Sequence, residues 1–141
     1  MLLDVNVLVA LAWPNHQFHD AARRWFRSSG KKGWCTCAIT QLGFIRLSSN
    51  PAFTEHARTP QESAMLLARM TAHEAHRYLD MLLAPAGEDA WARTVGHRQT
   101  TDVYLALVAR AHDTKLATFD ARLAAHTAIG NAVFVLAANH G

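Results

Sequence analysis

Three aspartates lie at the ends of apolar segments of the chain. Asp4 and Asp120 each end a short apolar run, and Asp102 opens a long apolar stretch. An ionised carboxylate in apolar surroundings is costly unless a cation or hydrogen bonds compensate it. Carboxylate oxygens are ligands of hard divalent cations such as Mg²⁺, and such an ion can activate water or orient a phosphodiester. The pattern therefore indicates a candidate divalent metal site.

The elements around these aspartates decide whether they meet. If residues 1–4 and 115–119 form neighbouring strands of a parallel sheet, Asp4 and Asp120 emerge at the same edge, where open α/β sheets bind ligands. Asp102 at a helix start lies in the favourable field of the helix dipole, which is expected to help keep it ionised. Thr118, and Asn6 in the turn after Asp4, are candidates to hydrogen-bond a metal-bound water. The simpler roles stay open, because Asp is a favoured helix cap and turn chemistry equally explains Thr118 and Asn6.

The remaining patterns alternate between strand and helix. Strands are expected at residues 1–4, 34–37, 115–119 and 133–136. Helices are expected at 6–13, from 19, at 41–47 with Thr40 as cap, from Pro60, at 74–83 and at 101–113, with a short helix around Ala90. This alternation predicts an α/β fold of three layers, α/β/α, with a mostly parallel sheet. A chain of 141 residues is expected to form one domain, residues 1–141.

Composition narrows the class of protein. Half of the residues are apolar and 18% are charged, as in globular proteins, and a net charge of +3 permits a nucleic-acid partner without requiring one. No apolar run is long enough to span a membrane, and the amino terminus is typical of a buried strand rather than a secretory signal. Cys35 and Cys37 are too close for a good disulfide and too few for zinc. We therefore expect them to be reduced, buried thiols of a protein in the reducing cytoplasm rather than a functional pair.

Histidines and basic residues are further candidates for binding zinc or RNA. The pairs His16/His19 and His73/His76 lack a third zinc ligand, so they are expected to be solvated. The basic residues between 23 and 32 either steer RNA or form the polar face of an amphipathic helix, and the second reading is favoured.

Four segments, residues 2–8, 35–46, 96–105 and 115–120, together carry a resemblance to a known family. Each alone is a weak signal, but the ordered set, spread across nearly the whole chain, is specific. It resembles a PIN domain, and more closely a VapC-type toxin of bacterial toxin–antitoxin pairs. The resemblance implies a PIN-like sheet with strand order 3-2-1-4-5, which places the strands ending at Asp4 and Asp120 side by side.

The resemblance also implies an activity and partners. It implies a ribonuclease dependent on Mg²⁺ or Mn²⁺ that cleaves cellular RNA and arrests translation until a cognate antitoxin protein blocks it. Homodimers are usual in this family. The family's acidic positions map onto Asp4, Asp102 and Asp120 as catalytic metal ligands, with Thr118 beside the last. Arg46, His97 and Arg98 are candidate RNA contacts, although a solvated surface role explains each equally well.

One position departs from the family pattern. Gln41 stands where a PIN domain usually has a glutamate at the start of the third helix. An amide keeps hydrogen-bonding capacity but not the charge, so Gln41 is a candidate to contact the metal through a bridging water. Losing one charge about 4 Å from a cation costs roughly 4 kcal/mol at an effective dielectric near 20, before water rearrangement offsets part of it. One metal is still expected to bind. The alternative is a catalytically weakened PIN-fold binding module, and a structural role for Gln41 in the first helical turn also stays open.

Overall fold

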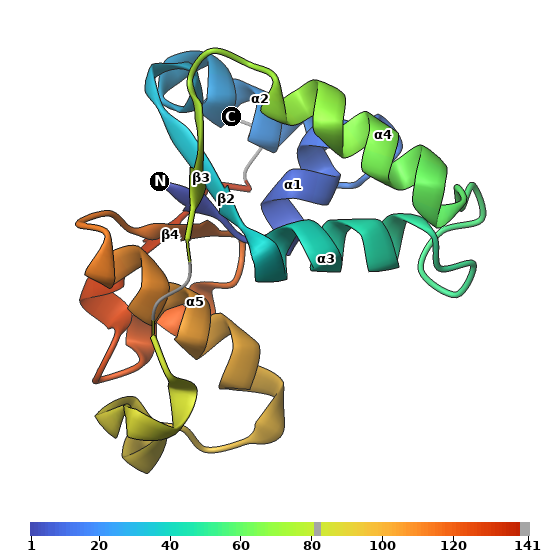
Figure 1. The fold of residues 1–141 in the computed structure, drawn as a ribbon. Helices are drawn as coiled ribbons and strands as arrows, with labels where there is room; N and C mark the ends of the chain where they lie inside the picture. Colours follow the sequence, from blue (N-terminus) through green and yellow to red (C-terminus); the bar gives the residue numbers. More distant parts are fainter. Residues whose placement is uncertain (81–82, 139–141) are drawn as a thin grey trace.

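A parallel sheet forms the middle layer of the fold (Figure 1). The computed structural model describes residues 1–80 and 83–138. Its strands are β1 (Leu2–Leu3), β2 (Trp34–Cys37), β3 (His76–Leu79), β4 (Leu116–Thr118) and β5 (Val133–Val135). Their order is β3-β2-β1-β4-β5, and every pairing is parallel. The expected fold class and strand order are therefore confirmed.

The two central strands explain how the candidate site is positioned. Leu2 and Leu3 are fully buried on opposite faces of the sheet, and they pair with Leu116 and Ala117 of β4, which are also fully buried. Strands covered on both faces are expected to be apolar, as β1 is throughout and β4 is up to the buried Thr118 at its end. The first polar side chain of β1 therefore comes where the strand ends, at Asp4, whose backbone N–H donates to the Ala117 carbonyl at 2.9 Å.

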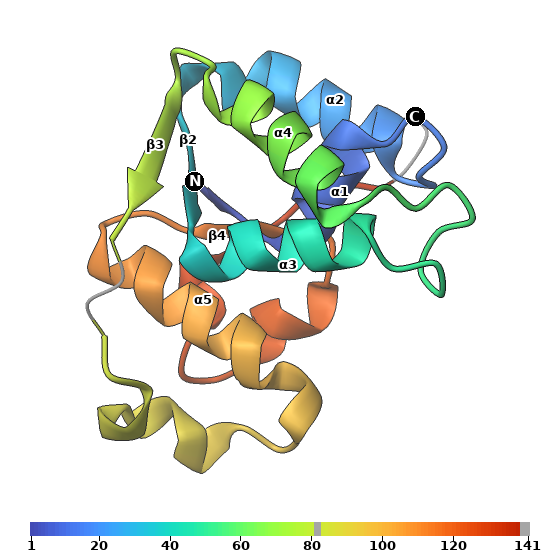
Figure 2. The ribbon, with the colours of Figure 1, turned by 45° about the vertical axis from the view of Figure 1, so that its right-hand side comes forward.

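Helices cover both faces of the sheet, as Figure 2 shows from a second direction. On one face α5 (Thr100–Ala111) buries residues 103–109 against Leu2 and Leu116. On the other face lie α1 (Val5–Ala12), α2 (His19–Ser28) and α4 (Pro60–Thr71), while α3 (Ala38–Ser48) contributes Phe44 to the same apolar cluster. The near-continuous burial of α5 agrees with its uninterrupted apolar sequence.

Close packing of α1 against α3 depends on a glycine. A Cβ placed on Gly43 of α3 would lie 2.5 Å from a methyl carbon of Val5, in the first turn of α1. Such a contact is closer than side chains tolerate, so a larger residue at position 43 would force a shift of the Val5 side chain or of the helix that carries it. Because Asp4 is the N-cap of that helix, Gly43 also supports the position of the Asp4 carboxylate.

The start of α3 differs from the sequence prediction. The helix begins at Ala38, and its N-cap is Cys37 rather than Thr40. Thr40 lies in the first turn, where its buried hydroxyl accepts from the Cys37 backbone N–H at 3.0 Å. Pro60, by contrast, opens α4 as expected, with Thr59 and Glu62 forming a capping box around it.

The helix predicted at residues 74–83 is wrong. Residues His76–Leu79 form the edge strand β3, paired in register with β2, and positions 81–82 lie outside the described residues. An edge strand with only Leu79 buried shows no clear alternation of apolar and polar residues. His76 is also less solvated than expected, because its Nε2 lies 2.8 Å from the Thr36 hydroxyl and burial lowers its pKa.

Both cysteines are free and buried, as expected, and both belong to the apolar cluster on the α5 face. Within the described parts of the chain, none of the helices has the length and apolarity needed to span a bilayer.

Candidate active site

The structure brings Asp4, Asp102 and Asp120 to one edge of the sheet. Asp4 follows β1 directly, Asp120 lies two residues beyond β4, and Asp102 occupies the first turn of α5. Their charges act on one another: Asp4 and Asp120 both raise the pKa of Asp102, and Asp120 raises that of Asp4. Three carboxylates from distant parts of the sequence thus share one electrostatic environment, as the sequence predicts.

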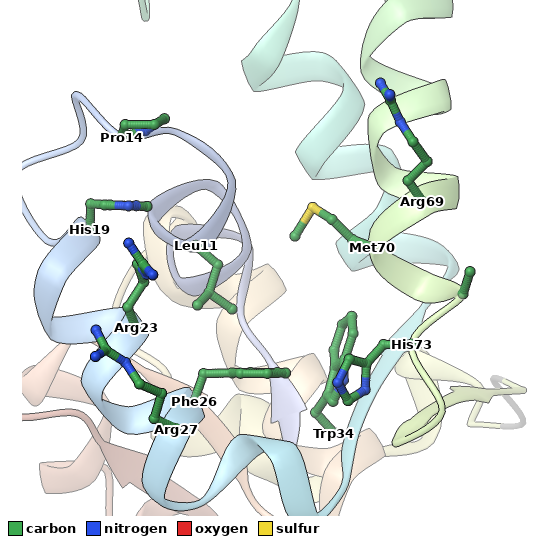
Figure 3. Close-up of a pocket in the computed structure, with 11 residues that line it drawn as sticks. Leu11, Pro14, His19, Arg23, Phe26, Arg27, Trp34, Arg69, Met70 and His73 are labelled. Atoms are coloured by element: carbon green, nitrogen blue, oxygen red, sulfur yellow. The ribbon is translucent and has the colours of Figure 1, made fainter.

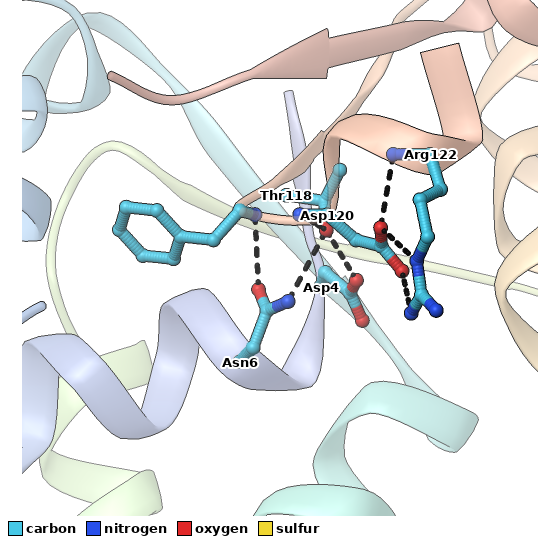
Figure 4. Close-up of polar contacts among 6 residues, drawn as sticks. Asp4, Asn6, Thr118, Asp120 and Arg122 are labelled. Atoms are coloured by element: carbon cyan, nitrogen blue, oxygen red, sulfur yellow. Dashed lines mark hydrogen bonds and ion pairs between the residues drawn. The ribbon is translucent and has the colours of Figure 1, made fainter. Parts of the chain in front are cut away.

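Thr118 is the centre of the hydrogen bonds that hold Asp4 (Figure 4). The Thr118 hydroxyl donates to Asp4 Oδ2 at 2.7 Å, while Asp4 Oδ1 accepts from the Val5 backbone N–H at 2.7 Å. The same hydroxyl oxygen accepts from Asn6 Nδ2 at 3.2 Å and from the Asp120 backbone N–H at 3.1 Å. The hydroxyl that was expected to face a metal-bound water therefore fixes the carboxylate itself, and it links β1, α1 and the turn after β4.

Asn6 belongs to the helix rather than to a turn. It is the second residue of α1, and its Oδ1 accepts from the Phe119 backbone N–H at 3.4 Å while its amide group contacts Thr118. Its two hydrogen bonds therefore join the start of α1 to the end of β4, which keeps the backbone on both sides of Asp4 in place.

Asp120 is paired with Arg122, a residue that the sequence patterns did not single out. Arg122 Nε donates to Asp120 Oδ1 at 3.0 Å, and a terminal guanidinium nitrogen donates to Oδ2 at 2.9 Å. The hydrogen bonds and charge of Arg122 hold the pKa of Asp120 below its usual value. Asp120 also accepts from the Arg122 backbone N–H, so it caps the following 3₁₀ turn, Ala121–Ala125. Asp120 therefore both caps a turn and belongs to the acidic site. The same holds for Asp4, which caps α1.

Any help from the helix dipole in keeping Asp102 ionised is outweighed by its surroundings. Burial, followed by the charges of Asp4 and Asp120, raises the pKa of Asp102 to about 7, and the charge of Arg122 opposes this only in part. The dipole contributes at most about 1 kcal/mol at most sites, which is less than the combined cost of desolvation and two like charges. Burial also raises the pKa of Asp4, which is only 5% exposed.

Gln41 is directed toward β2 rather than toward the aspartates. Its Nε2 donates to the buried hydroxyl of Thr36 at 3.0 Å, and that hydroxyl also lies within hydrogen-bond distance of His76. This arrangement matches the structural reading of Gln41: the amide ties the first turn of α3 to the sheet. Among the described residues, the acidic site thus consists of three carboxylates, without a contribution from the amide.

The three candidate RNA contacts lie on the surface. Arg46 is exposed in the last turn of α3, and His97 and Arg98 are exposed in the short turn that leads into α5. The turn precedes Asp102 by only a few residues, so these two side chains lie on a segment that continues into the acidic site.

The donor set fits a hard divalent cation in charge and in chemistry. The described side chains offer carboxylate oxygens, which Mg²⁺ and Mn²⁺ prefer, and three carboxylates opposed by one guanidinium leave a net charge of −2 when all are ionised. Within residues 1–80 and 83–138, however, no three His, Cys, Asp or Glu side chains already stand at metal-binding spacing. Closure around an ion would therefore require the carboxylates to approach, and Asp120 is held by Arg122.

A second concave region lies away from the aspartates. A hollow of about 790 Å³ opens between α2, α4 and the start of β2 (Figure 3). Phe26, Trp34 and Met70 supply apolar surface, and Arg23 and Arg27 of α2 face Arg69 of α4 around it. Some of the basic residues of α2 thus flank a hollow instead of forming only a solvated face. The shape and charge suit an apolar segment that carries acidic side chains.

Comparison with known proteins identifies the class to which this fold and acidic edge belong. The PIN domain model matches residues 1–129, and the chain belongs to the PIN domain family. It is similar to three ribonucleases of Mycobacterium tuberculosis. It is 40% identical to Ribonuclease VapC39 over 134 residues, which cover 92% of this chain and 94% of that protein. Identity is 40% to Ribonuclease VapC38, over 85% of this chain and 84% of that protein, and 38% to Ribonuclease VapC44, over 87% of each.

Proposed function

We propose that the chain is an endoribonuclease toxin that depends on Mg²⁺ or Mn²⁺, cleaves cellular RNA and thereby inhibits translation. The observation that carries this proposal is the convergence of Asp4, Asp102 and Asp120, whose mutual repulsion calls for a cation. Membership of the PIN family and the similarity to proteins named ribonucleases support the choice of an RNA substrate.

In the proposed mechanism, the three aspartates would hold the cation. When bound, such an ion would neutralise charge on the phosphodiester and lower the pKa of the attacking water. Asp102 and Asp4 must each be ionised to serve as ligands, so any proton that burial keeps on them is released at that stage. Thr118 and Asn6 keep the Asp4 carboxylate oriented throughout, because their hydrogen bonds tie it to two elements of the fold.

The proposed substrate site extends from the acidic edge along the exposed cations Arg46, His97 and Arg98. Arginine binds phosphate through charge and paired N–H donors, and such contacts supply affinity that is largely independent of sequence. The proposed protein partner is a cognate antitoxin, and we expect the chain to form a homodimer. The hollow flanked by Arg23, Arg27 and Arg69 offers apolar contact and positive charge to an acidic segment of such a partner.

The test is cleavage of defined RNA by the purified protein with Mg²⁺, with Mn²⁺ and with EDTA. We expect cleavage only with the metals, and we expect Asp4→Asn and Asp102→Asn to reduce it at least a hundredfold while leaving the circular dichroism spectrum unchanged. Expression of the parent, but not of either variant, should arrest growth and protein synthesis. If both variants cleave as fast as the parent, the assignment of the site is wrong.

The alternative proposal is a PIN-fold binding module with weakened catalysis. It is motivated by Gln41, an amide that is directed to Thr36 and adds no charge to the site. Calorimetry with Mn²⁺ on the parent and on Gln41→Glu separates the two proposals. An absence of binding in the parent with recovery in the variant would favour the binding module, whereas clear binding by the parent would remove the reason for it.

A further inference from the structure

The ion pair between Asp120 and Arg122 has features of a temporary contact. Three hydrogen bonds from Arg122 reach the Asp120 carboxylate, two from the guanidinium and one from the backbone N–H. A carboxylate has about four lone pairs available, so little acceptor capacity remains for a metal ion. The Asp120 carboxylate is thus engaged by Arg122 in a structure whose described acidic side chains do not yet stand at metal-binding spacing.

The two partners differ greatly in exposure. The Arg122 side chain is 82% exposed, whereas that of Asp120 is 21% exposed. Arg122 follows Asp120 by two residues in a short 3₁₀ turn, so rotation of its side chain can move the guanidinium into solvent without moving the backbone. Ion pairs with one partner in water contribute little stability, and a divalent cation bound by several carboxylates can displace such a partner.

Once the Arg122 guanidinium has left Asp120, it is free to bind a phosphate group. It lies at the rim of the site, where its charge is felt by both Asp120 and Asp102. A phosphodiester held at a metal in this site would present unesterified oxygens close to that rim. The planar guanidinium, with its paired donors, binds phosphate oxygens as well as carboxylate oxygens.

We propose that Arg122 is a positioning residue that changes partners: it occupies the Asp120 carboxylate in the metal-free protein, yields it to the cation, and then binds an RNA phosphate. The inference rests on the proposed function, because it assumes that a cation and RNA meet at this site. It assigns to one exposed arginine two opposite effects, namely weaker metal binding and stronger RNA binding. A residue that only stabilises the fold would not produce this combination.

The test uses Arg122→Gln and Arg122→Lys, with Arg77→Gln as a control. Arg77 is exposed on β3, next to a hollow that includes Met1, Gly33 and Asp113, at the opposite edge of the sheet. The control removes the same formal charge without touching the site. The lysine variant keeps the local charge but cannot form the paired hydrogen bonds, so it separates the effect of charge from that of the bidentate contact.

Two quantities are measured for each protein: the Kd for Mn²⁺ by calorimetry without RNA, and the KM for a short RNA at saturating Mn²⁺. We expect Arg122→Gln to lower the Kd for Mn²⁺ about two- to fivefold, the range for loss of an exposed ion pair, and to raise the KM severalfold. Arg122→Lys should also bind Mn²⁺ more tightly but keep a KM closer to that of the parent. Arg77→Gln should change neither quantity.

The outcomes distinguish this inference from the proposed function. If the parent binds Mn²⁺ and cleaves RNA, but Arg122→Gln binds Mn²⁺ no more tightly, the exchange of partners is wrong while the nuclease proposal stands. An unchanged KM in Arg122→Gln would likewise overturn the exchange. If neither the parent nor Arg122→Gln binds Mn²⁺, both proposals fall.

Discussion

Replacement of Asp102 by asparagine should stabilise the metal-free protein at neutral pH. Burial and neighbouring charge raise the pKa of Asp102 from 3.8 to about 7. A shift of about three units corresponds to about 4 kcal/mol, and solvent screening of this partly exposed carboxyl reduces the expected effect to about 2 kcal/mol. Asparagine has nearly the same shape without the charge, so Asp102→Asn should recover about that amount.

The sign of the pH dependence follows from the direction of the shift. Between pH 3.8 and about 7 the folded protein binds more protons at Asp102 than the unfolded chain does. The contribution of Asp102 to the free energy of unfolding is therefore highest below that range, falls as pH rises through it, and is constant above it. The advantage of Asp102→Asn should be full at pH 8 and less than half as large at pH 5.

Urea denaturation in EDTA, at pH 8 and at pH 5, measures this difference directly. Asp89→Asn is a matched control, because Asp89 is exposed at the start of a 3₁₀ turn remote in sequence from the aspartates of the site. We expect a higher denaturation midpoint for Asp102→Asn at pH 8, with a Tm raised by about 5 °C or more, and little change for the control. A variant that is less stable than the parent at pH 8, or a gain that is equal at both pH values, would refute the electrostatic reasoning.

Three further predictions concern the surroundings of the site. The affinity for Mn²⁺, measured by calorimetry, should increase as pH rises from 6 to 8. The reason is that the raised pKa of Asp102 lets protons compete with the metal below pH 7. An affinity independent of pH would contradict this prediction. Gly43→Ala should lower the free energy of unfolding by about 1–3 kcal/mol through overpacking, while Gly87→Ala, which meets nothing within 4 Å, should not. Thr118→Val should remove one of the two hydrogen-bond donors to the Asp4 carboxylate and raise the pKa of Asp4 further, which an NMR titration would detect, and no shift would contradict the role of the hydroxyl.

Patterns local in sequence predict the positions of the three aspartates well. Asp4 directly follows the fully buried apolar residues of β1, and Asp120 lies two residues beyond β4, whose Leu116 and Ala117 are buried on the two faces of the sheet. The continuous burial of residues 103–109 in α5 likewise shows in the apolar sequence of that stretch. Such features depend on neighbours along the chain and on a parallel sheet, both of which the sequence indicates.

Features that depend on contacts between residues far apart in the sequence cannot be predicted from local patterns. The edge strand β3 has mixed polarity because only part of it is buried, and its pairing with β2 decides its conformation. The raised pKa of Asp102 results from burial and from carboxylates on other elements. The Arg122 contact is local, but a spacing of two residues is outside the usual helical pairs, so only an Asp-x-Arg pattern at the end of a strand could have signalled it.

The central claim is that Asp4, Asp102 and Asp120 together hold one divalent cation. Anomalous diffraction from crystals grown with Mn²⁺ would test it most directly. We expect one anomalous peak per chain, about 2.1 Å from carboxylate oxygens of all three aspartates, with Arg122 turned away from Asp120. A peak at another place, or no peak while the three carboxylates stay as they are in the metal-free fold, would contradict it.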